Sequence, residues 1–140
     1  MSKRNVELAR RAIEAFNARD IEGLVAHFDS RCDVHSGFAA IGGAVYHGHD
    51  GLRESFRDSE HAWGEIRIEP EAYFDLGEHT LSFYVLHACG RRSGVEVARP
   101  IAQVARWRDG LIVYLKPYRD RGEALRDLGV SEDELEPIEP

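Results

Sequence analysis

The spacing of apolar residues changes near the middle of the chain. Before residue 64, apolar residues recur every three or four positions, which is the period of helices that bury one side. From residue 64 onward they alternate with polar residues, which is the period of β-strands. The pattern therefore predicts a mainly helical first half and a β-sheet in the second half.

Three helices and one short strand are expected in the first half. A helix over residues 5–18 places Ile13 and Phe16 on its apolar side. A shorter helix follows Asp20, whose carboxylate can accept a hydrogen bond from the first free N–H groups. The stretch "CDVHS" predicts a short strand, and a glycine-rich loop then leads to a third helix that Asp50 caps.

Four strands and a short helix are expected in the second half. The sequences "DLGEH", "GRRSG" and "RDG" are typical of the tight turns that join neighbouring strands. Asp120 and Gly129 are suited to begin and end the final helix. Strands joined by short turns form an antiparallel meander, so we predict an α+β fold in which helices pack on one face of a curved antiparallel sheet.

Length and charge limit the broad class. The 140 residues are 43% hydrophobic and 31% charged, which predicts one globular domain, assigned to residues 1–130. Five acids and no base lie in residues 131–140, so we expect an acidic C-terminal tail in solvent. The rest of the chain has a net charge of only −2, too balanced for nucleic-acid binding.

No apolar run approaches the roughly 20 residues that span a bilayer, and the N-terminus lacks the apolar stretch of a secretory signal. We therefore expect no membrane partner and a cytoplasmic location. Cys32 and Cys89 are far apart and lie in no metal-ligand spacing. The seven histidines match no strong ligand pattern either, so we expect no metal and no cofactor.

One strand side carries a histidine among apolar residues. In "LSFYVLHACG", alternation places His87 with Leu81, Phe83 and Val85, opposite a side that includes Tyr84. A buried polar group without a partner costs about 1–3 kcal/mol, so His87 needs a hydrogen bond. It is either a structural histidine with a local partner or a polar group in a ligand pocket.

Long stretches resemble a known family. "ARRAIEAFNARDIEGLVAHFDSRCDVH" resembles the opening helices and first strand of the SnoaL-like group of the nuclear transport factor 2 fold. "YHGHDGLRESF" resembles its loop into the third helix, and "SGVEVARPIAQVARWRDGLIVYLKPYRDRGEALRDLGV" its last hairpin and closing helix. The resemblance covers residues 5–130. It implies that three N-terminal helices and the curved sheet form a cone around an apolar pocket.

The acid–base residues of three enzyme groups of this fold are missing from the matching positions. The resemblance assigns the ketosteroid isomerase roles to Ala12, Ser36 and Ala102, which cannot perform them, so we expect no such activity. Pro117 stands where limonene epoxide hydrolases carry their catalytic aspartate. The region that matches the inward aspartate of the polyketide cyclase SnoaL, near Val104, has no acid either.

The resemblance directs His87 into the pocket. There it is expected to act with Tyr46, as scytalone dehydratase of this fold combines pocket histidines and tyrosines. Asp33 and His35 are expected to lie off the pocket, on the other side of their strand. The expected ligand-binding residues are Phe16, Val34, Ser36, Ser55, Phe56, Ser59, Phe83, Val85 and Leu115.

Two function classes stay open. The first is a cofactor-independent isomerase, cyclase or dehydratase that acts on a small hydrophobic metabolite. The second is a non-catalytic ligand-binding protein or a structural dimer. Proteins of this fold commonly form homodimers through the outer sheet face, for which Tyr84, Leu86 and Trp107 are expected to provide the contact. Arg99 would bind an acidic ligand only if Pro100 marks a bulge that turns it inward.

Overall fold

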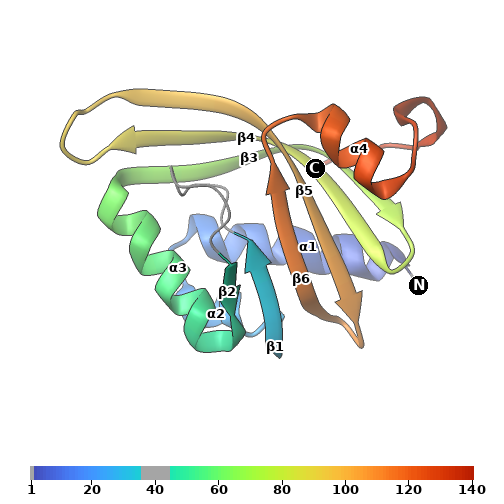
Figure 1. Ribbon diagram of the computed structural model, residues 1–140, viewed down its shortest axis with the longest axis horizontal. Coiled ribbons are helices and arrows are strands. Elements are labelled where there is room, and N and C mark those ends of the chain that lie inside the picture. Colours follow the sequence, from blue (N-terminus) through green and yellow to red (C-terminus); the bar gives the residue numbers. More distant parts are fainter. Residues whose placement is uncertain (1, 36–44) are drawn as a thin grey trace.

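The computed structural model describes residues 2–35 and 45–140, and it shows helices packed against one curved sheet (Figure 1). The expected α+β fold is confirmed. The elements in chain order are α1 (Ser2–Asn17), α2 (Ile21–Val25), β1 (Phe28–His35), β2 (Val45–His47), α3 (Gly48–Ala62), β3 (Trp63–Leu76), β4 (His79–Gly90), β5 (Glu96–Arg108), β6 (Leu111–Tyr118), α4 (Arg121–Leu128) and a 3₁₀ turn at Glu132–Glu134.

The sheet has six strands in the order β2-β1-β6-β5-β4-β3. The four strands of the second half form the expected antiparallel meander. β1 joins the meander beside its last strand and runs parallel to β6. This parallel pair is the one departure from an antiparallel sheet among the described strands. It places β1, the first strand, beside β6, the last one, and leaves β2 and β3 at the two edges of the sheet (Figure 1).

The start of α2 and both ends of α4 lie where capping chemistry predicts them. Asp20 accepts a hydrogen bond from the N–H group three residues later, at 2.9 Å, and begins α2. Asp120 accepts one from the N–H group two residues later, at 2.8 Å, and begins α4. Gly129 ends α4 with a φ of 71°, which glycine adopts without steric cost. Asp50 does not cap α3, because that helix already begins at Gly48.

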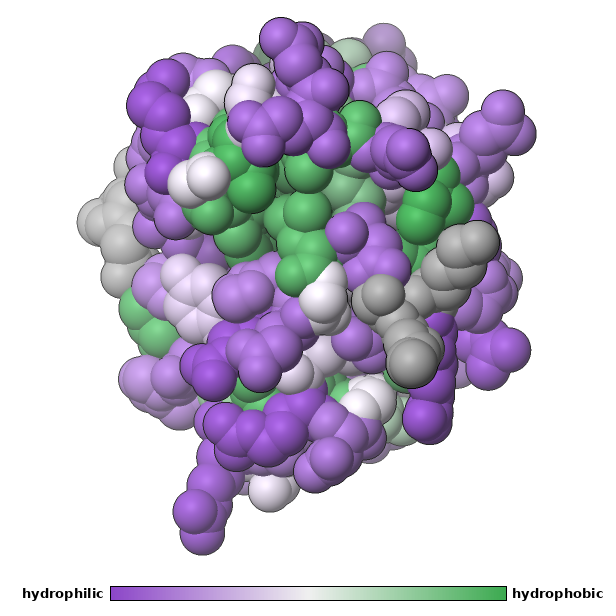
Figure 2. All heavy atoms as spheres, turned by 90° about the vertical axis from the view of Figure 1, so that its right-hand side faces the viewer, coloured by the Kyte–Doolittle hydropathy of each residue, from purple (hydrophilic) through white to green (hydrophobic). Residues whose placement is uncertain are grey.

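Different elements bury the two faces of the sheet. On the concave face, α1, α2 and α3 form the larger apolar cluster, which includes Ile13, Tyr84 and Trp107. On the outer face, α4 covers a second cluster. Its buried members are Phe74, Leu81, Phe83, Ala102, Val104, Tyr118 and Ala124. Figure 2 shows apolar side chains gathered on the face of the molecule near α4, among polar neighbours. The sheet therefore separates two apolar cores.

The five acids of the C-terminal tail are exposed, as expected, but two apolar residues of the tail contact the body. Leu135 packs on the second cluster, and Ile138 packs on the first. Ile138 also exchanges two backbone hydrogen bonds with Tyr73 of β3, of 2.9 and 2.6 Å. The acids dominate the tail's composition, but the two apolar side chains between them provide its contacts.

Candidate functional site

A cavity of about 100 Å³ lies between the helices and the concave face of the sheet. Its walls are mostly apolar, as is usual for small-molecule sites. Most of the residues expected to bind the ligand do line it. These are Phe16 of α1, Val34 of β1, Ser55, Phe56 and Ser59 of α3, and Leu115 of β6. Ser36 lies outside the described residues.

The side of β4 that faces the cavity is not the expected one but the opposite one. Thr80, Ser82 and Tyr84 line the cavity. Phe83 belongs to the second cluster on the outer face, and Val85 and His87 share that outer side. The assignment of Phe83, Val85 and His87 to the pocket is therefore wrong. The physical reason for the error is that α4 packs on the outer face of the sheet, so the apolar residues on the outer side of β4 are buried in the second cluster.

His87 has a local partner on the outer side of the sheet. Its Nε2 lies 2.7 Å from Oε1 of Glu69 on β3, and its side chain is 34% exposed. The hydrogen bond from His87 lowers the pKa of the Glu69 carboxyl below its ordinary value. This contact satisfies the imidazole without any ligand, as expected of a structural histidine.

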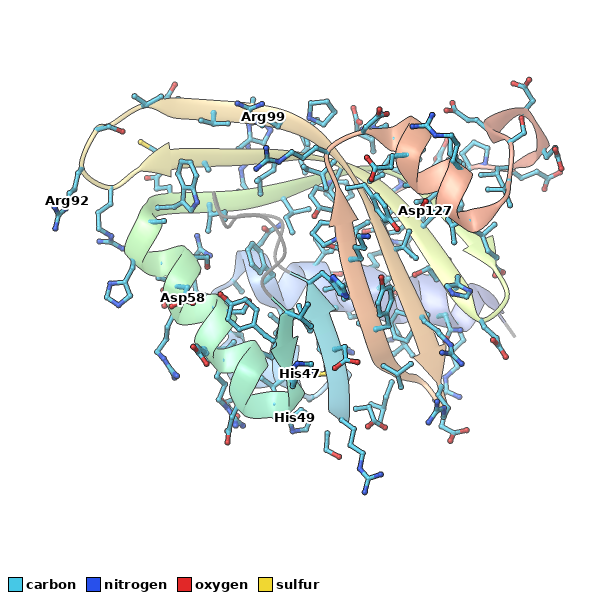
Figure 3. All side chains as sticks on the ribbon, viewed as in Figure 1. His47, His49, Asp58, Arg92, Arg99 and Asp127 are labelled. Atoms are coloured by element: carbon cyan, nitrogen blue, oxygen red, sulfur yellow. The ribbon has the colours of Figure 1, made fainter. Side chains whose placement is uncertain are left out.

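Tyr46 and His87 do not form a pair. The Tyr46 hydroxyl donates a 2.7 Å hydrogen bond to Oδ2 of Asp58. Asp58 lies on α3 (Figure 3). The Asp58 carboxylate raises the pKa of Tyr46 to about 12, so its proton is held firmly at neutral pH. Tyr46 is absent from the cavity lining, as is His87. The structure therefore gives no support to a Tyr46–His87 catalytic pair.

Two hydrogen-bonded pairs of side chains join neighbouring strands in the part of the cavity wall that the sheet forms. The Tyr84 hydroxyl donates to Gln103 Oε1 at 2.9 Å, and the Trp107 indole N–H donates to Thr80 Oγ1 at 2.9 Å. All four residues line the cavity, and each pair joins β4 to β5. Burial raises the pKa of Tyr84, which is only 1% exposed. Tyr84 is therefore a neutral hydrogen-bonding group.

The sequence did not predict Gln103 as a cavity residue, because the resemblance assigned the wrong side of β5 to the cavity. The resemblance placed a catalytic position at Ala102, but Ala102 is fully buried in the second cluster on the outer face. The next residue, Gln103, faces the cavity instead. A polar residue within the apolar run "IAQVA" was the signal that marks it.

His35 borders the cavity at the end of β1, but its ring lies on the side of the strand opposite Val34, as expected from the sequence. The ring centroid lies 5.1 Å from that of Tyr114, a β6 residue that does not line the cavity. Burial, with a smaller contribution from Lys116, lowers the pKa of His35 below its ordinary value. The imidazole is therefore mainly neutral at neutral pH and can accept a proton.

Arg99 does not enter the cavity. The β4–β5 register continues without a bulge across Pro100, and Arg99 is exposed (Figure 3). Pro100 therefore does not mark the bulge that would be needed to turn Arg99 toward the cavity.

The histidines near α3 have other partners. His47 Nδ1 lies 2.6 Å from Asp33 Oδ1, and His49 Nε2 lies 2.8 Å from the carbonyl oxygen of Phe28. In residues 2–35 and 45–140, no group of three or more His, Cys, Asp or Glu side chains could hold a metal ion. Over the same residues, no helix combines the length and apolar character needed to cross a membrane.

Sequence comparison agrees with this arrangement. The model of the SnoaL-like domain matches residues 9–115. The chain belongs to the SnoaL-like domain family. No curated protein matches the sequence.

Solved structures share the fold of this SnoaL-like protein. An NTF2-like protein of unknown function from Burkholderia pseudomallei has a TM-score of 0.76 and 23% identity, over 88% of this chain and 95% of that one. TerC co-crystallized with polyporic acid has a TM-score of 0.75 and 21% identity, over 89% and 97%. A putative polyketide cyclase from Xanthomonas campestris has a TM-score of 0.75 and 15% identity, over 89% and 96%. At these identities the similarity shows the fold alone.

Proposed function

We propose that this SnoaL-like protein binds one small, mostly apolar molecule that carries a carbonyl or hydroxyl oxygen. The observation that carries the proposal is the Tyr84–Gln103 pair in a mostly apolar cavity. A cavity that only filled space in the core would not need two adjacent hydrogen-bonding side chains on its wall. Such polar groups orient a ligand and select for its oxygen atoms.

The pair leaves hydrogen-bond donors available to a ligand. When the Tyr84 hydroxyl donates to Gln103 Oε1, both N–H groups of the Gln103 amide remain. With the amide turned over, one amide N–H and the phenol O–H remain. Either orientation leaves two donors, and no hydrogen bond between Gln103 Nε2 and another described residue uses them. An oxygen acceptor on the ligand would satisfy them.

The cavity volume restricts the size of the ligand. About 100 Å³ is somewhat smaller than the roughly 150 Å³ engineered cavity that binds benzene. A molecule of one six-membered ring with one oxygen atom is therefore near the upper limit of size for this cavity.

The same groups support acid–base chemistry without a cofactor. Donors placed at a carbonyl oxygen stabilise the negative charge that forms when a proton leaves the neighbouring carbon. His35, which borders the cavity, would have to turn its ring away from Tyr114 and inward to take that proton. An isomerase, cyclase or dehydratase needs such a step, and two neighbours of this fold are TerC, co-crystallized with polyporic acid, and a putative polyketide cyclase. In the alternative, a non-catalytic binding protein, the donors only orient the ligand.

The binding proposal can be tested with a matched pair of probes. Cyclohexanone and methylcyclohexane have similar size, but only the ketone accepts a hydrogen bond. We expect Gln103→Leu to weaken ketone binding about two- to tenfold, the value of one hydrogen bond, and to leave hydrocarbon binding unchanged. His87→Gln, on the outer side of β4, is the control and should change neither. Equal losses for both probes, or no loss, would contradict the proposal.

A second measurement separates the enzyme from the binding protein. A catalytic site should accelerate the exchange of deuterium from solvent into the carbon next to the ketone carbonyl, and His35→Gln should remove that acceleration. A protein that binds cyclohexanone and leaves the exchange rate at its value in buffer is the non-catalytic alternative.

We also propose a homodimer, with a corrected contact surface. Tyr84, Leu86 and Trp107 are buried in the larger cluster and cannot contact a partner. The outer side of the β4–β5 hairpin is available instead, where Val85 lies opposite Pro100 in the register. Light scattering on the intact chain tests the dimer, and Val85→Lys should weaken it.

A further inference from the structure

β3 lies at one edge of the described sheet, with β4 on one side and no described strand of three or more residues on the other. An open edge presents unpaired N–H and C=O groups, which readily pair with another chain. In this protein, side chains from the end of α1 and the turn after it, and the C-terminal tail, form hydrogen bonds to some of those groups along β3.

The side-chain amide of Asn17, at the end of α1, forms the same pair of hydrogen bonds to β3 that a neighbouring strand would form. Its Oδ1 accepts a hydrogen bond from the Ile68 N–H, and its Nδ2 donates one to the Ile68 carbonyl, both at 2.8 Å. Arg19 donates from Nη2 to the Ile66 carbonyl at 2.6 Å. Two residues after Ile68, Pro70 has no N–H to offer. This half of the edge is therefore closed by side chains.

The other half is closed by residues 135–139, which we name the C-terminal strap. The Tyr73 N–H donates to the Ile138 carbonyl at 2.9 Å, and the Ile138 N–H donates to the Tyr73 carbonyl at 2.6 Å. Arg10 of α1 fastens the strap, because its Nη2 donates to the Glu139 carbonyl at 2.7 Å. The same guanidinium lies 5.3 Å from the centre of the Tyr73 ring.

The composition of the strap prevents it from extending the sheet further. Pro137 and Pro140 lie on either side of the Ile138–Glu139 pair and have no N–H groups. Pairing is accordingly limited to the single bridge between Tyr73 and Ile138. Glu136 and Glu139 add negative charge beside that bridge. Prolines and charges are the features by which proteins discourage strand pairing at an edge.

We propose that the C-terminal strap is an edge cap, which stops β3 from pairing with β3 of a second copy of this chain. An antiparallel contact centred on Tyr73 is self-complementary, as a two-fold contact between identical chains must be. Glu71, which would lie in that contact, is already paired with Arg121 of α4, so its charge is partly compensated. The proposal is independent of the cavity and of its ligand.

A pair of substitutions at one position tests the cap. Ile138→Pro removes the N–H that donates to Tyr73, whereas Ile138→Ala shortens the side chain and keeps both backbone hydrogen bonds. In the proline variant we expect the Tyr73 amide to exchange its hydrogen about tenfold faster than in the alanine variant. Of these two variants, only the proline variant should show, by light scattering, species that are larger than those of the intact chain and that increase with protein concentration.

Arg10→Met releases the strap from the opposite side and leaves the backbone of the tail unchanged. It should produce the same larger species, and melting curves show whether each variant is folded. The cap is refuted if Tyr73 exchange accelerates while the assembly stays that of the intact chain. It is equally refuted if Ile138→Pro leaves Tyr73 exchange unchanged, since the strap would then not be docked in solution. Cyclohexanone binding should be the same in all three variants.

Discussion

The two sides of β4 differ in composition and in what covers them. The concave side, with Thr80, Ser82 and Tyr84, is polar in sequence and lines the cavity. The outer side, with Leu81 and Phe83, is apolar and lies in the second cluster beneath α4. The more apolar side is thus ordinary core, and the more polar side is the candidate binding site. A site must recognise the oxygen atoms of a ligand, whereas a core only has to exclude water.

The polar side is tolerated because its groups are paired across strands. Thr80 accepts a hydrogen bond from Trp107, and Tyr84 donates one to Gln103. Each buried hydroxyl therefore has a hydrogen-bond partner. The outer side changes along its length. Leu81 is fully buried, while His87 is partly exposed and paired with Glu69. One strand side can therefore pass from core to surface within six residues.

Among substitutions on the two sides of β4, we expect Leu81→Ala to have the largest effect on stability. Leu81 is fully buried in the second cluster, and removing its side chain should reduce the free energy of unfolding by about 2–5 kcal/mol. Ketone binding in the cavity should persist, because Leu81 lies on the other side of the sheet. Urea unfolding and a binding titration measure the two effects. A variant of normal stability that has lost the ketone would mean that the two sides are not separate.

A smaller effect is expected from Thr80→Val, on the cavity side. Valine has nearly the same shape but cannot accept the hydrogen bond from the Trp107 indole, which would be left buried and unpaired. We expect a loss of about 1–3 kcal/mol and a shift in the fluorescence of the protein. Thr80→Ser keeps the acceptor and is the matched control. Similar losses in both variants would show that packing, and not the hydrogen bond, stabilises this pair.

The smallest effect is expected from His87→Phe. The partner of His87, Glu69, lies largely in solvent, so the melting temperature near neutral pH should stay close to that of the intact chain. Because the folded pKa of Glu69 is lowered, the stabilisation is present above its ordinary value of 4.5 and is lost as the pH falls through the lowered value. The variant lacks this contribution.

His87→Phe should consequently lose less stability than the intact chain on acidification below that range. Thermal unfolding measured as a function of pH tests this expectation, with Arg92→Gln as a control that removes an exposed charge in the turn between β4 and β5. A strongly destabilised variant, or one with altered ketone binding, would place His87 in the core or at the cavity after all.

Local chemistry in the sequence was enough to predict the elements. Asp20 and Asp120 begin their helices as expected because each carboxylate satisfies an N–H within three residues. Asp109 and Gly110 both have positive φ, as the two-residue hairpin turn at "RDG" requires. These contacts join residues close together in the chain, so the sequence alone determined the helices, the meander and the α+β class.

The tertiary structure decided which side of each strand faces the cavity. Alternation divides β4 into the side of Leu81 and the side of Tyr84, but both were apolar enough to be buried, and both are. Their environments depend on α4, whose helix begins more than thirty residues further along the chain. The docking of Ile138 on Tyr73 is longer in range still. Packing between distant segments removes each side from water, and no periodicity within one strand encodes which partner will do so.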